Sequence, residues 1–375
     1  MTVINMANAQ AAITHGQEQA AGKYLSSLIE ARKAPGLQYV LVDADHVLFK
    51  FNGGYADIGE QRPVGDSTTF NGYSITKTFT AAAILKLAAE SRIDLDAPIS
   101  RYVQDIPYQG VPTVRQTLQH TAGFPNPNPM PWIHRADKHG EFDAHAFISK
   151  VIREHPKLDF EPGEKFAYSN IGYLLLGEAI HRVSGKPYEQ YVLSEIIEPL
   201  SLAGDQHISF TIDHPENHAR GHIRRWNWLN LFLGWFFDRE KFLVSGSVEG
   251  WVEFRDLLPD GAAYGGLVGS ASGFARYLQA ILKVEPPFTR EMLDKLWTPG
   301  TTLSGERLPV GLAWFERKMG SHRYLAHSGG AGGYYCEMRI YPDAKLASVI
   351  MTNNTGITRQ NLLDGIDRIF LDQGN

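Results

Sequence analysis

The sequence contains a single cysteine, Cys336, among its 375 residues. One thiol cannot form an intrachain disulfide, and it cannot supply the several ligands of a multi-cysteine metal site. This usage is compatible with a reducing compartment. Cys336 lies in an apolar, strand-like run, so we expect it to belong to the hydrophobic core.

An excess of positive charge is also missing. The chain has 36 Lys and Arg against 41 Asp and Glu, a net charge of -5. No run of basic residues is present that could follow a phosphate backbone. We therefore expect no nucleic acid among the partners of this protein.

Long apolar runs are absent as well. The most lipophilic stretch, WNWLNLFLGWFF at 226–237, is shorter than the roughly 20 apolar residues that a transmembrane helix needs. No stable membrane insertion is therefore expected. The N-terminus lacks the basic and continuous apolar regions of a signal peptide, so the sequence as written predicts a cytoplasmic protein. A periplasmic location would require a precursor segment.

Several common catalytic signatures are missing. The chain has no GxSxG nucleophile elbow, no HExxH zinc helix and no GxxxxGK[ST] phosphate loop. Histidines at positions 207, 214, 218 and 222 raise a metal site as an alternative. Pro215 and Gly221 argue against a rigid helix there, so a metal site is the disfavoured interpretation.

Strand patterns gather near both ends of the chain, and helical patterns lie between them. Residues 37–43 and 46–51 predict a hairpin, and 334–354 predict a second strand pair that turns at 342–344. The predicted helices are 75–91, 113–120, 142–154, 170–184, 187–198, 272–284 and 361–371. The chain is longer than one hydrophobic core supports, so we predict an α/β fold with a sheet built from both termini and a mostly helical inserted lobe.

The stretch NGYSITKTFTAAAILKLAAE holds a Ser-x-x-Lys pattern, Ser74 and Lys77, at the predicted start of a helix. Backbone N–H groups point outward there and favour developing negative charge. Lys77 lies one turn on, within reach of the serine oxygen, and a serine hydroxyl needs such a base to become a nucleophile. The alternative is a serine N-cap followed by a solvated lysine.

The second pattern is Tyr168-Ser169-Asn170, the only Y-x-N in the chain, just before a strongly apolar helix. Tyr168 could relay a proton, and Asn170 could hold an amide or ester oxygen. A helix cap with a packed aromatic residue is the structural alternative.

The third pattern is HSGGAGGYY at 327–335, which begins with the only H-x-G. Glycines such as Gly329 would let a substrate lie close against a strand edge, and the amide of Gly330 could pair with that of Ser74 as an oxyanion hole. The alternative is a glycine-rich hairpin with a surface histidine at His327.

These three patterns in this order resemble the serine β-lactamase and penicillin-binding-protein superfamily, and most closely the branch of class C β-lactamases, D-stereospecific peptidases and family VIII esterases. RIDLDAPISRYV, TVRQTLQHTAGF, EPGEKFAYSNIGYLLLGEAI and GGLVGSASGFARYLQAIL extend the resemblance over about 37–355. It implies an α/β lobe (1–75 and 262–375) with an antiparallel sheet, a mostly helical lobe (76–261), and an active site in the cleft between them.

The resemblance also implies roles for individual residues. Ser74 would be the nucleophile, Lys77 and Tyr168 the shared general base and acid, and Asn170 a substrate ligand. His327, with Gly329 and Gly330, would form the substrate-binding third motif. The resemblance implies neither a metal nor an organic cofactor.

His327 departs from a common family pattern. Many β-lactamases and transpeptidases have a lysine at this position, whereas an unperturbed histidine is mostly neutral near pH 7. The first hypothesis is therefore an esterase or small-amide hydrolase that forms an acyl-enzyme. The second is a D,D-carboxypeptidase, D-aminopeptidase or β-lactamase acting on cell-wall-like substrates. The third, a non-catalytic binding protein, is disfavoured because the catalytic residue types are all present. The expected partner is a small ester, amide or short peptide, and the sequence does not predict an oligomeric state.

The aromatic segment 226–246 must bury its side chains, either within the helical lobe, at a membrane interface, or as a wall or lid over the cleft. In the last case Trp235 and Phe236 would favour uncharged lipophilic esters.

Overall fold

The computed structural model describes residues 13–104, 106–108, 112–226, 239–355 and 362–372. The helices are α1 (His15–Glu30), α2 (Thr76–Ala89), α3 (Val114–Leu118), α4 (Ala144–Glu154), α5 (Asn170–Ser184), α6 (Tyr188–Val192), α8 (Arg239–Phe242), α9 (Ala262–Gly265), α10 (Ala271–Lys283), α11 (Arg290–Trp297) and α12 (Leu362–Leu371). The strands are β1 (Gly36–Val42), β2 (Val47–Asp57), β3 (Arg62–Pro63), β4 (Phe70–Asn71), β5 (Ile133–Arg135), β6 (Ile208–Ser209), β7 (His222–Arg224), β8 (Trp251–Glu253), β9 (Leu257–Pro259), β10 (Val268–Gly269), β11 (Phe315–Met319), β12 (His322–Ala331), β13 (Tyr334–Tyr341) and β14 (Leu346–Thr352).

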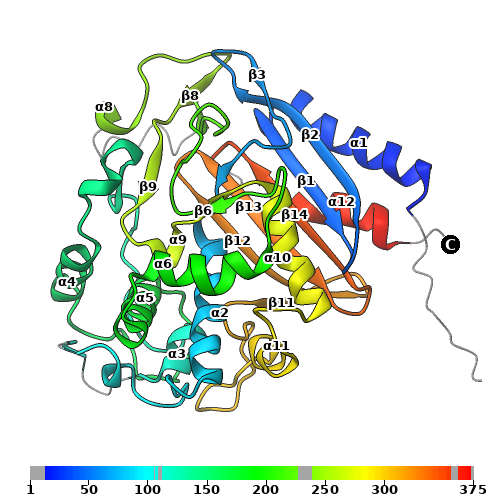
Figure 1. Ribbon diagram of the computed structural model, residues 1–375. Coiled ribbons are helices and arrows are strands. Elements are labelled where there is room, and N and C mark those ends of the chain that lie inside the picture. The colour runs from blue at the N-terminus through cyan, green and yellow to red at the C-terminus, as the bar shows by residue number, and fades with distance from the viewer. Residues whose placement is uncertain (1–12, 105, 109–111, 227–238, 356–361, 373–375) are drawn as a thin grey trace, which may run out of the picture.

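The main sheet joins the two ends of the chain. Its order is β11-β12-β13-β14-β1-β2-β3, and neighbouring strands are antiparallel throughout. Strand β1 pairs with β2 in the predicted hairpin, and β13 pairs with β14 in the second predicted pair. Because β14 also pairs with β1, the sheet built from both termini is confirmed (Figure 1).

Strand β1 is buried at every position because both faces of the sheet are covered. Successive side chains of a strand point to opposite faces. Tyr39 and Leu41 accordingly pack with α1 and α12, whereas Val40 and Val42 belong to the large core around α2. Figure 1 shows α1 and α12 together along one face of the sheet.

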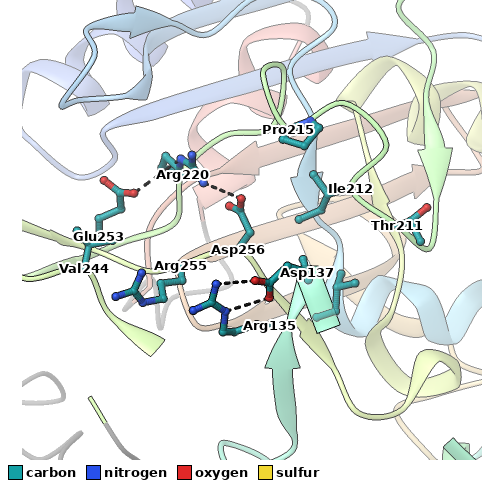
Figure 2. Close-up of a pocket in the computed structure, with 12 residues that line it drawn as sticks. Arg135, Asp137, Thr211, Ile212, Pro215, Arg220, Val244, Glu253, Arg255 and Asp256 are labelled. Atoms are coloured by element: carbon teal, nitrogen blue, oxygen red, sulfur yellow. Dashed lines mark hydrogen bonds and ion pairs between the residues drawn. The ribbon is translucent and has the colours of Figure 1, made fainter. Parts of the chain in front are cut away.

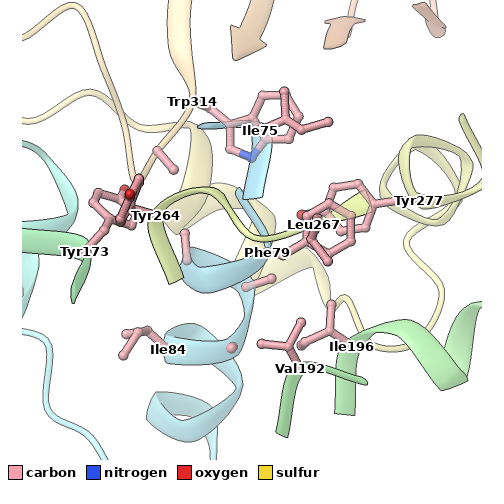
Figure 3. Packing of buried hydrophobic residues seen from close by; sticks show 14 of the residues in the cluster. Ile75, Phe79, Ile84, Tyr173, Val192, Ile196, Tyr264, Leu267, Tyr277 and Trp314 are labelled. Carbon is pink, nitrogen blue, oxygen red and sulfur yellow. The ribbon is translucent and has the colours of Figure 1, made fainter. Parts of the chain in front are cut away.

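Helix α2 runs through the centre of the large core. Eleven of its residues are buried on all sides of the helix, so it lacks the apolar stripe of a surface helix. Phe79 stacks on Tyr277 of α10 with ring centroids 3.8 Å apart, and Figure 3 shows the surrounding side chains. This burial holds α2, and with it the Ser-x-x-Lys pattern, in one fixed position.

Most predicted helices are present with shifted ends. Helix α4 begins at Ala144 because the Asp143 side chain accepts a hydrogen bond from the amide of Ala146. The single helix predicted over 187–198 is wrong in detail, since α6 continues as a π-helical turn at Leu193–Ile197 and a 3₁₀ turn at Glu198–Leu200. Helices α1, α8, α9 and α11, strands β11 and β12, and the short strands β3 to β10 are not among the predicted elements.

No helix in the described part of the chain combines the length and the apolar character needed to cross a membrane. The aromatic segment is described only at its ends. Trp226 is largely exposed, whereas Phe242 and Leu243 pack in a small cluster with Phe254. Residues 227–238, including Trp235 and Phe236, lie outside the described residues, so the interpretation of this segment as a lid stays a prediction.

Candidate active site

Ser74 lies in a strained turn at the entrance to α2. The preceding Tyr73 has φ of +45°, in the left-handed region that residues other than glycine rarely adopt. Its hydroxyl donates a hydrogen bond of 2.8 Å to the carbonyl of Gly332, which anchors the turn. Ser74 is partly exposed between buried neighbours. Its side chain caps neither this 3₁₀ turn nor α2, contrary to the N-cap alternative.

The structure brings the Ser-x-x-Lys and Tyr-x-Asn patterns into direct contact. Lys77 Nζ lies 3.1 Å from Ser74 Oγ, and the Tyr168 hydroxyl lies 3.0 Å from the same oxygen. Lys77 also donates to Asn170 Oδ1 at 2.9 Å and to the carbonyl of Tyr264 at 2.8 Å. The predicted nucleophile therefore has two proton-transfer groups within hydrogen-bond distance.

Lys77 is fully buried rather than solvated. Burial lowers its pKa well below the ordinary lysine value, because an ammonium group loses its hydration there. The rings of Tyr168, Tyr173 and Tyr264 surround Nζ at 5.0, 5.4 and 5.3 Å from their centroids. A neutral amine able to accept a proton is thus far more accessible here than at a surface lysine.

Tyr168 differs from Lys77 in its protonation. Desolvation raises the pKa of its hydroxyl above the ordinary value, although the residue as a whole is partly exposed. Tyr168 is therefore protonated at neutral pH and acts as a hydrogen-bond donor to Ser74. The next residue, Ser169, caps α5 by accepting from the amide of Gly172, so the capping role and the placement of Tyr168 and Asn170 coexist.

His327 lies inside β12 and is only 2% exposed, contrary to the surface-histidine alternative. Its Nδ1 donates to the carbonyl of Ser328 at 2.9 Å, and Nε2 has no partner among the described residues. Burial, followed by the nearby Lys77 charge, lowers its pKa to about 3. His327 is therefore neutral at physiological pH and offers no fixed positive charge to a substrate.

Strand β12 leaves one edge open beside Ser74. The pairing with β11 ends at Phe315 and Ala326, whereas the pairing with β13 continues to Ala331. A Cβ atom at Gly329 would lie 2.2 Å from the carbonyl oxygen of Gly72 and 2.8 Å from the amide of Ser74. Only glycine permits this approach. Gly330 follows on the exposed edge.

Cys336 faces the same turn from β13 and is buried, as predicted. Its thiol contacts the carbonyl of Gly72 at 2.7 Å, and burial raises its pKa. It is thus an inert packing residue behind the turn that carries Ser74.

Two participants, His120 and Tyr264, were not predicted. Tyr264 acts through its backbone carbonyl, which no sequence pattern reveals. His120 belongs to the family-like stretch TVRQTLQHTAGF but was assigned no role. Its backbone carbonyl accepts from the amide of Ala167, its Nδ1 accepts from that of Ser169, and its ring lies 4.3 Å from the Tyr168 ring.

His120 therefore holds the residues on both sides of Tyr168. Since a backbone N–H can only donate, Nδ1 must be unprotonated, and burial followed by the nearby Lys77 charge keeps the pKa of His120 well below its usual range. His120 also has φ of +58°, a conformation that asparagine tolerates better than alanine.

We expect His120→Ala to lower kcat about 10- to 100-fold, because Tyr168 loses the ring that holds it in place. The variant also leaves the buried amide of Ser169 without an acceptor, which should lower the free energy of unfolding by about 1–3 kcal/mol. His120→Asn keeps an acceptor oxygen near the Nδ1 position and should retain kcat within a few-fold. Steady-state kinetics with thermal unfolding of both variants provides the check. Equal losses of kcat in the two variants would show that the acceptor does not matter.

The four histidines considered as a metal site have other partners or lie apart. His218 contacts Thr69 Oγ1 and the Tyr334 hydroxyl, both at 3.0 Å, and His222 contacts the carbonyl of Asn353. Within the described ranges, no three His, Cys, Asp or Glu side chains converge as metal ligands.

The sequence is similar to that of proteins of known family. The family model described as Beta-lactamase matches residues 14–368. Penicillin-binding protein 4* of Bacillus subtilis (strain 168) is 26% identical over 339 residues, which cover 87% of this chain and 70% of the relative. The D-alanyl-D-alanine-carboxypeptidase/endopeptidase AmpH of Escherichia coli (strain K12) is 24% identical over 361 residues, covering 92% of this chain and 86% of AmpH.

Solved structures share the fold. An octameric penicillin-binding protein homologue from Pyrococcus abyssi superposes with a TM-score of 0.77 at 24% identity, covering 95% of this chain and 78% of that one. D-amino acid amidase from Ochrobactrum anthropi SV3, in complex with D-phenylalanine, superposes with a TM-score of 0.76 at 21% identity, covering 96% of this chain and 100% of that one.

Proposed function

Because the chain belongs to the beta-lactamase family and is a serine hydrolase, we propose that it hydrolyses a carboxylic ester or a small amide through an acyl-enzyme on Ser74. The observation that carries this proposal is the pair of contacts at Ser74 Oγ, with Lys77 Nζ at 3.1 Å and the Tyr168 hydroxyl at 3.0 Å. A buried lysine of lowered pKa and a protonated tyrosine supply the base and the acid that acyl transfer needs.

In the acylation step, neutral Lys77 accepts the Ser74 proton while Oγ bonds to the substrate carbonyl carbon. The carbonyl oxygen becomes an oxyanion, which we assign to the amides of Ser74 and Gly330. The close contact of Gly329 with the Ser74 amide supports this assignment, because it brings β12 against the nucleophile's turn. When the carbon–leaving-group bond breaks, the leaving oxygen or nitrogen takes a proton from Tyr168, which regains one from Lys77.

In deacylation, water attacks the acyl carbon and gives its proton to the same Lys77 and Tyr168 pair. The Ser74 oxygen leaves and recovers a proton, which releases the carboxylic acid product. We assign Asn170 to holding the substrate's carbonyl or amide group, since its side chain lies beside Lys77. Ser74 lies near the end of the first segment of the proposed α/β lobe (1–75 and 262–375). Lys77, Tyr168 and Asn170 belong to the proposed helical lobe (76–261).

The neutral third motif favours esters and small amides over substrates that carry a carboxylate next to the scissile bond. Burial lowers the pKa of His327 to about 3, so this residue supplies no positive charge to a substrate carboxylate. The second candidate is a peptidase or amidase acting on D-amino acid derivatives. The open edge of β12 favours it, since such an edge can pair with a peptide backbone. The names of AmpH and of the D-amino acid amidase point the same way.

A hydrolysis screen separates the two candidates. It compares nitrophenyl acetate, butyrate, hexanoate and octanoate with D-alanyl peptides, D-aminoacyl amides and a chromogenic cephalosporin, with Ser74→Ala as the blank. We expect the esters to have the highest kcat/KM. Faster cleavage of peptides that requires a free carboxylate beside the scissile bond would replace the esterase assignment with the peptidase one. If none of these substrates is turned over in a Ser74-dependent way, both the esterase and the peptidase proposals are wrong.

A further inference from the structure

A cavity of about 440 Å³ lies outside the catalytic contacts described above. Its walls come from β5 and the turn that follows it, from the loop after β6, and from the β8–β9 region (Figure 2). Ile212, Pro215, Val244 and Leu258 supply apolar surface, and the remaining lining is dominated by arginine and carboxylate side chains. The cavity is thus large enough for a short chain with a charged end.

Two of the three arginines in this cavity are neutralised, and the third is not. Arg135 pairs with Asp137 at 2.6 Å, and Arg220 pairs with Asp256 at 2.6 Å. Arg255 has no ion pair or side-chain hydrogen bond to any residue that the structure describes, and its Nε is buried without a partner. Figure 2 shows the dashed interactions of the first two arginines and none at Arg255.

The β8–β9 region, which forms one wall of the cavity, also contacts the turn that follows β12. The ring of Phe254, which precedes Arg255, lies 3.2 Å from where a Cβ of Gly332 would be. Gly332 lies in the turn between β12 and β13, two residues beyond Gly330 in the sequence. The same β8–β9 wall also contacts the segment that leads to Ser74, because the Asn71 side chain donates to the carbonyl of Leu257 at 2.8 Å.

We propose that this cavity binds a carboxylate at the far end of the substrate's acyl group, and that Arg255 is the residue that recognises it. The proposal rests on the proposed function and names its substrate class: esters or amides of ω-carboxyacyl groups, such as monoesters of dicarboxylic acids. A guanidinium binds a carboxylate through two parallel N–H donors, and the apolar lining accommodates the methylene chain.

An anionic group fits the cavity better than a cationic one. Asp137 and Asp256 already have arginine partners, and Glu253 lies 3.7 Å from Arg220. Desolvation raises the pKa of Glu253 above the ordinary value of a glutamate. The guanidinium of Arg255 is therefore the group that lacks a counter-ion. Since His327 is neutral, a substrate carboxylate would be bound at the Arg255 end of the site and not at the His327 end.

The test compares charged and neutral esters of equal chain length. Nitrophenyl monoesters of adipic and suberic acid are paired with nitrophenyl hexanoate and octanoate, and kcat/KM is measured in the wild type, in Arg255→Gln and in the control Arg290→Gln. Arg290 is exposed at the start of α11. We expect the ratio of charged to neutral kcat/KM to fall about 10- to 100-fold in Arg255→Gln alone, with the neutral esters unchanged.

Calorimetric titration of adipate into Ser74→Ala and into Ser74→Ala/Arg255→Gln makes the site testable without turnover. Binding to the first variant and its loss in the second would support the carboxylate site even if no ester is hydrolysed, and the proposed function alone would then fail. Ester hydrolysis with a charged-to-neutral ratio that is the same in all three proteins would overturn the carboxylate site and leave the proposed function standing. Adipate binding that survives Arg255→Gln would also overturn it.

Discussion

Ser74→Ala is expected to lower kcat/KM by about 10⁴- to 10⁶-fold, the largest loss that we predict for any single substitution. The variant removes the oxygen to which both Lys77 and Tyr168 are hydrogen bonded, so no acyl-enzyme can form. Only transition-state stabilisation by the surrounding amides would remain. Nitrophenyl ester hydrolysis, measured beside circular dichroism and thermal unfolding, is the appropriate measurement.

The fold should survive this change. The Ser74 side chain caps no helix, and the turn is held instead by Tyr73, Gly329 and Cys336. A variant that keeps its unfolding temperature and retains more than about one per cent of wild-type kcat/KM would place the nucleophile elsewhere.

Lys77→Ala and Tyr168→Phe are expected to have the next largest effects, about 10²- to 10⁴-fold each on kcat. Both side chains contact the same oxygen and form one proton-transfer unit, so removal of either disables the other. The double variant should therefore lose little more activity than the worse single variant. A loss equal to the product of the two single losses would contradict the shared-unit mechanism.

The pH dependence of the wild type tests the same unit. The neutral amine of Lys77 is the form that accepts the Ser74 proton, so kcat/KM should rise with pH through the folded-state pKa of Lys77. Burial lowers that pKa, so the plateau should be reached below the ordinary lysine value of 10.5. This acidic limb should be lost in Lys77→Ala. An identical limb in the variant would assign the titration to another group.

The sequence predicted the parts of this molecule whose signals are local. Apolar runs bounded by turn residues predicted the hairpin of β1 and β2 and the pair of β13 and β14. The Ser-x-x-Lys and Tyr-x-Asn patterns singled out Ser74, Lys77, Tyr168 and Asn170, which the structure brings into contact. Helix α1 was not predicted because it buries only Ala21, Leu25 and Leu28, which make a weak apolar pattern. These residues pack against α12, which lies at the other end of the chain.

Other features depend on contacts that no local pattern encodes. The carbonyl of Tyr264 reaches Lys77 only because α9 packs against α2, and the ring of His120 reaches Tyr168 across a separation of 48 positions in the sequence. The neutral state of His327 was expected from its ordinary pKa, whereas its burial required the assembled sheet. The unpaired Arg255 likewise becomes visible only beside the ion pairs of its neighbours.

The central claim, that Ser74 becomes acylated, is tested most directly by intact-mass analysis after reaction with a fluorophosphonate probe. The wild type should gain the mass of one adduct, and peptide mapping should place it on Ser74. Ser74→Ala should gain none, and Lys77→Ala should react much more slowly. An adduct on the Ser74→Ala variant, or a wild-type adduct on another residue, would contradict the account.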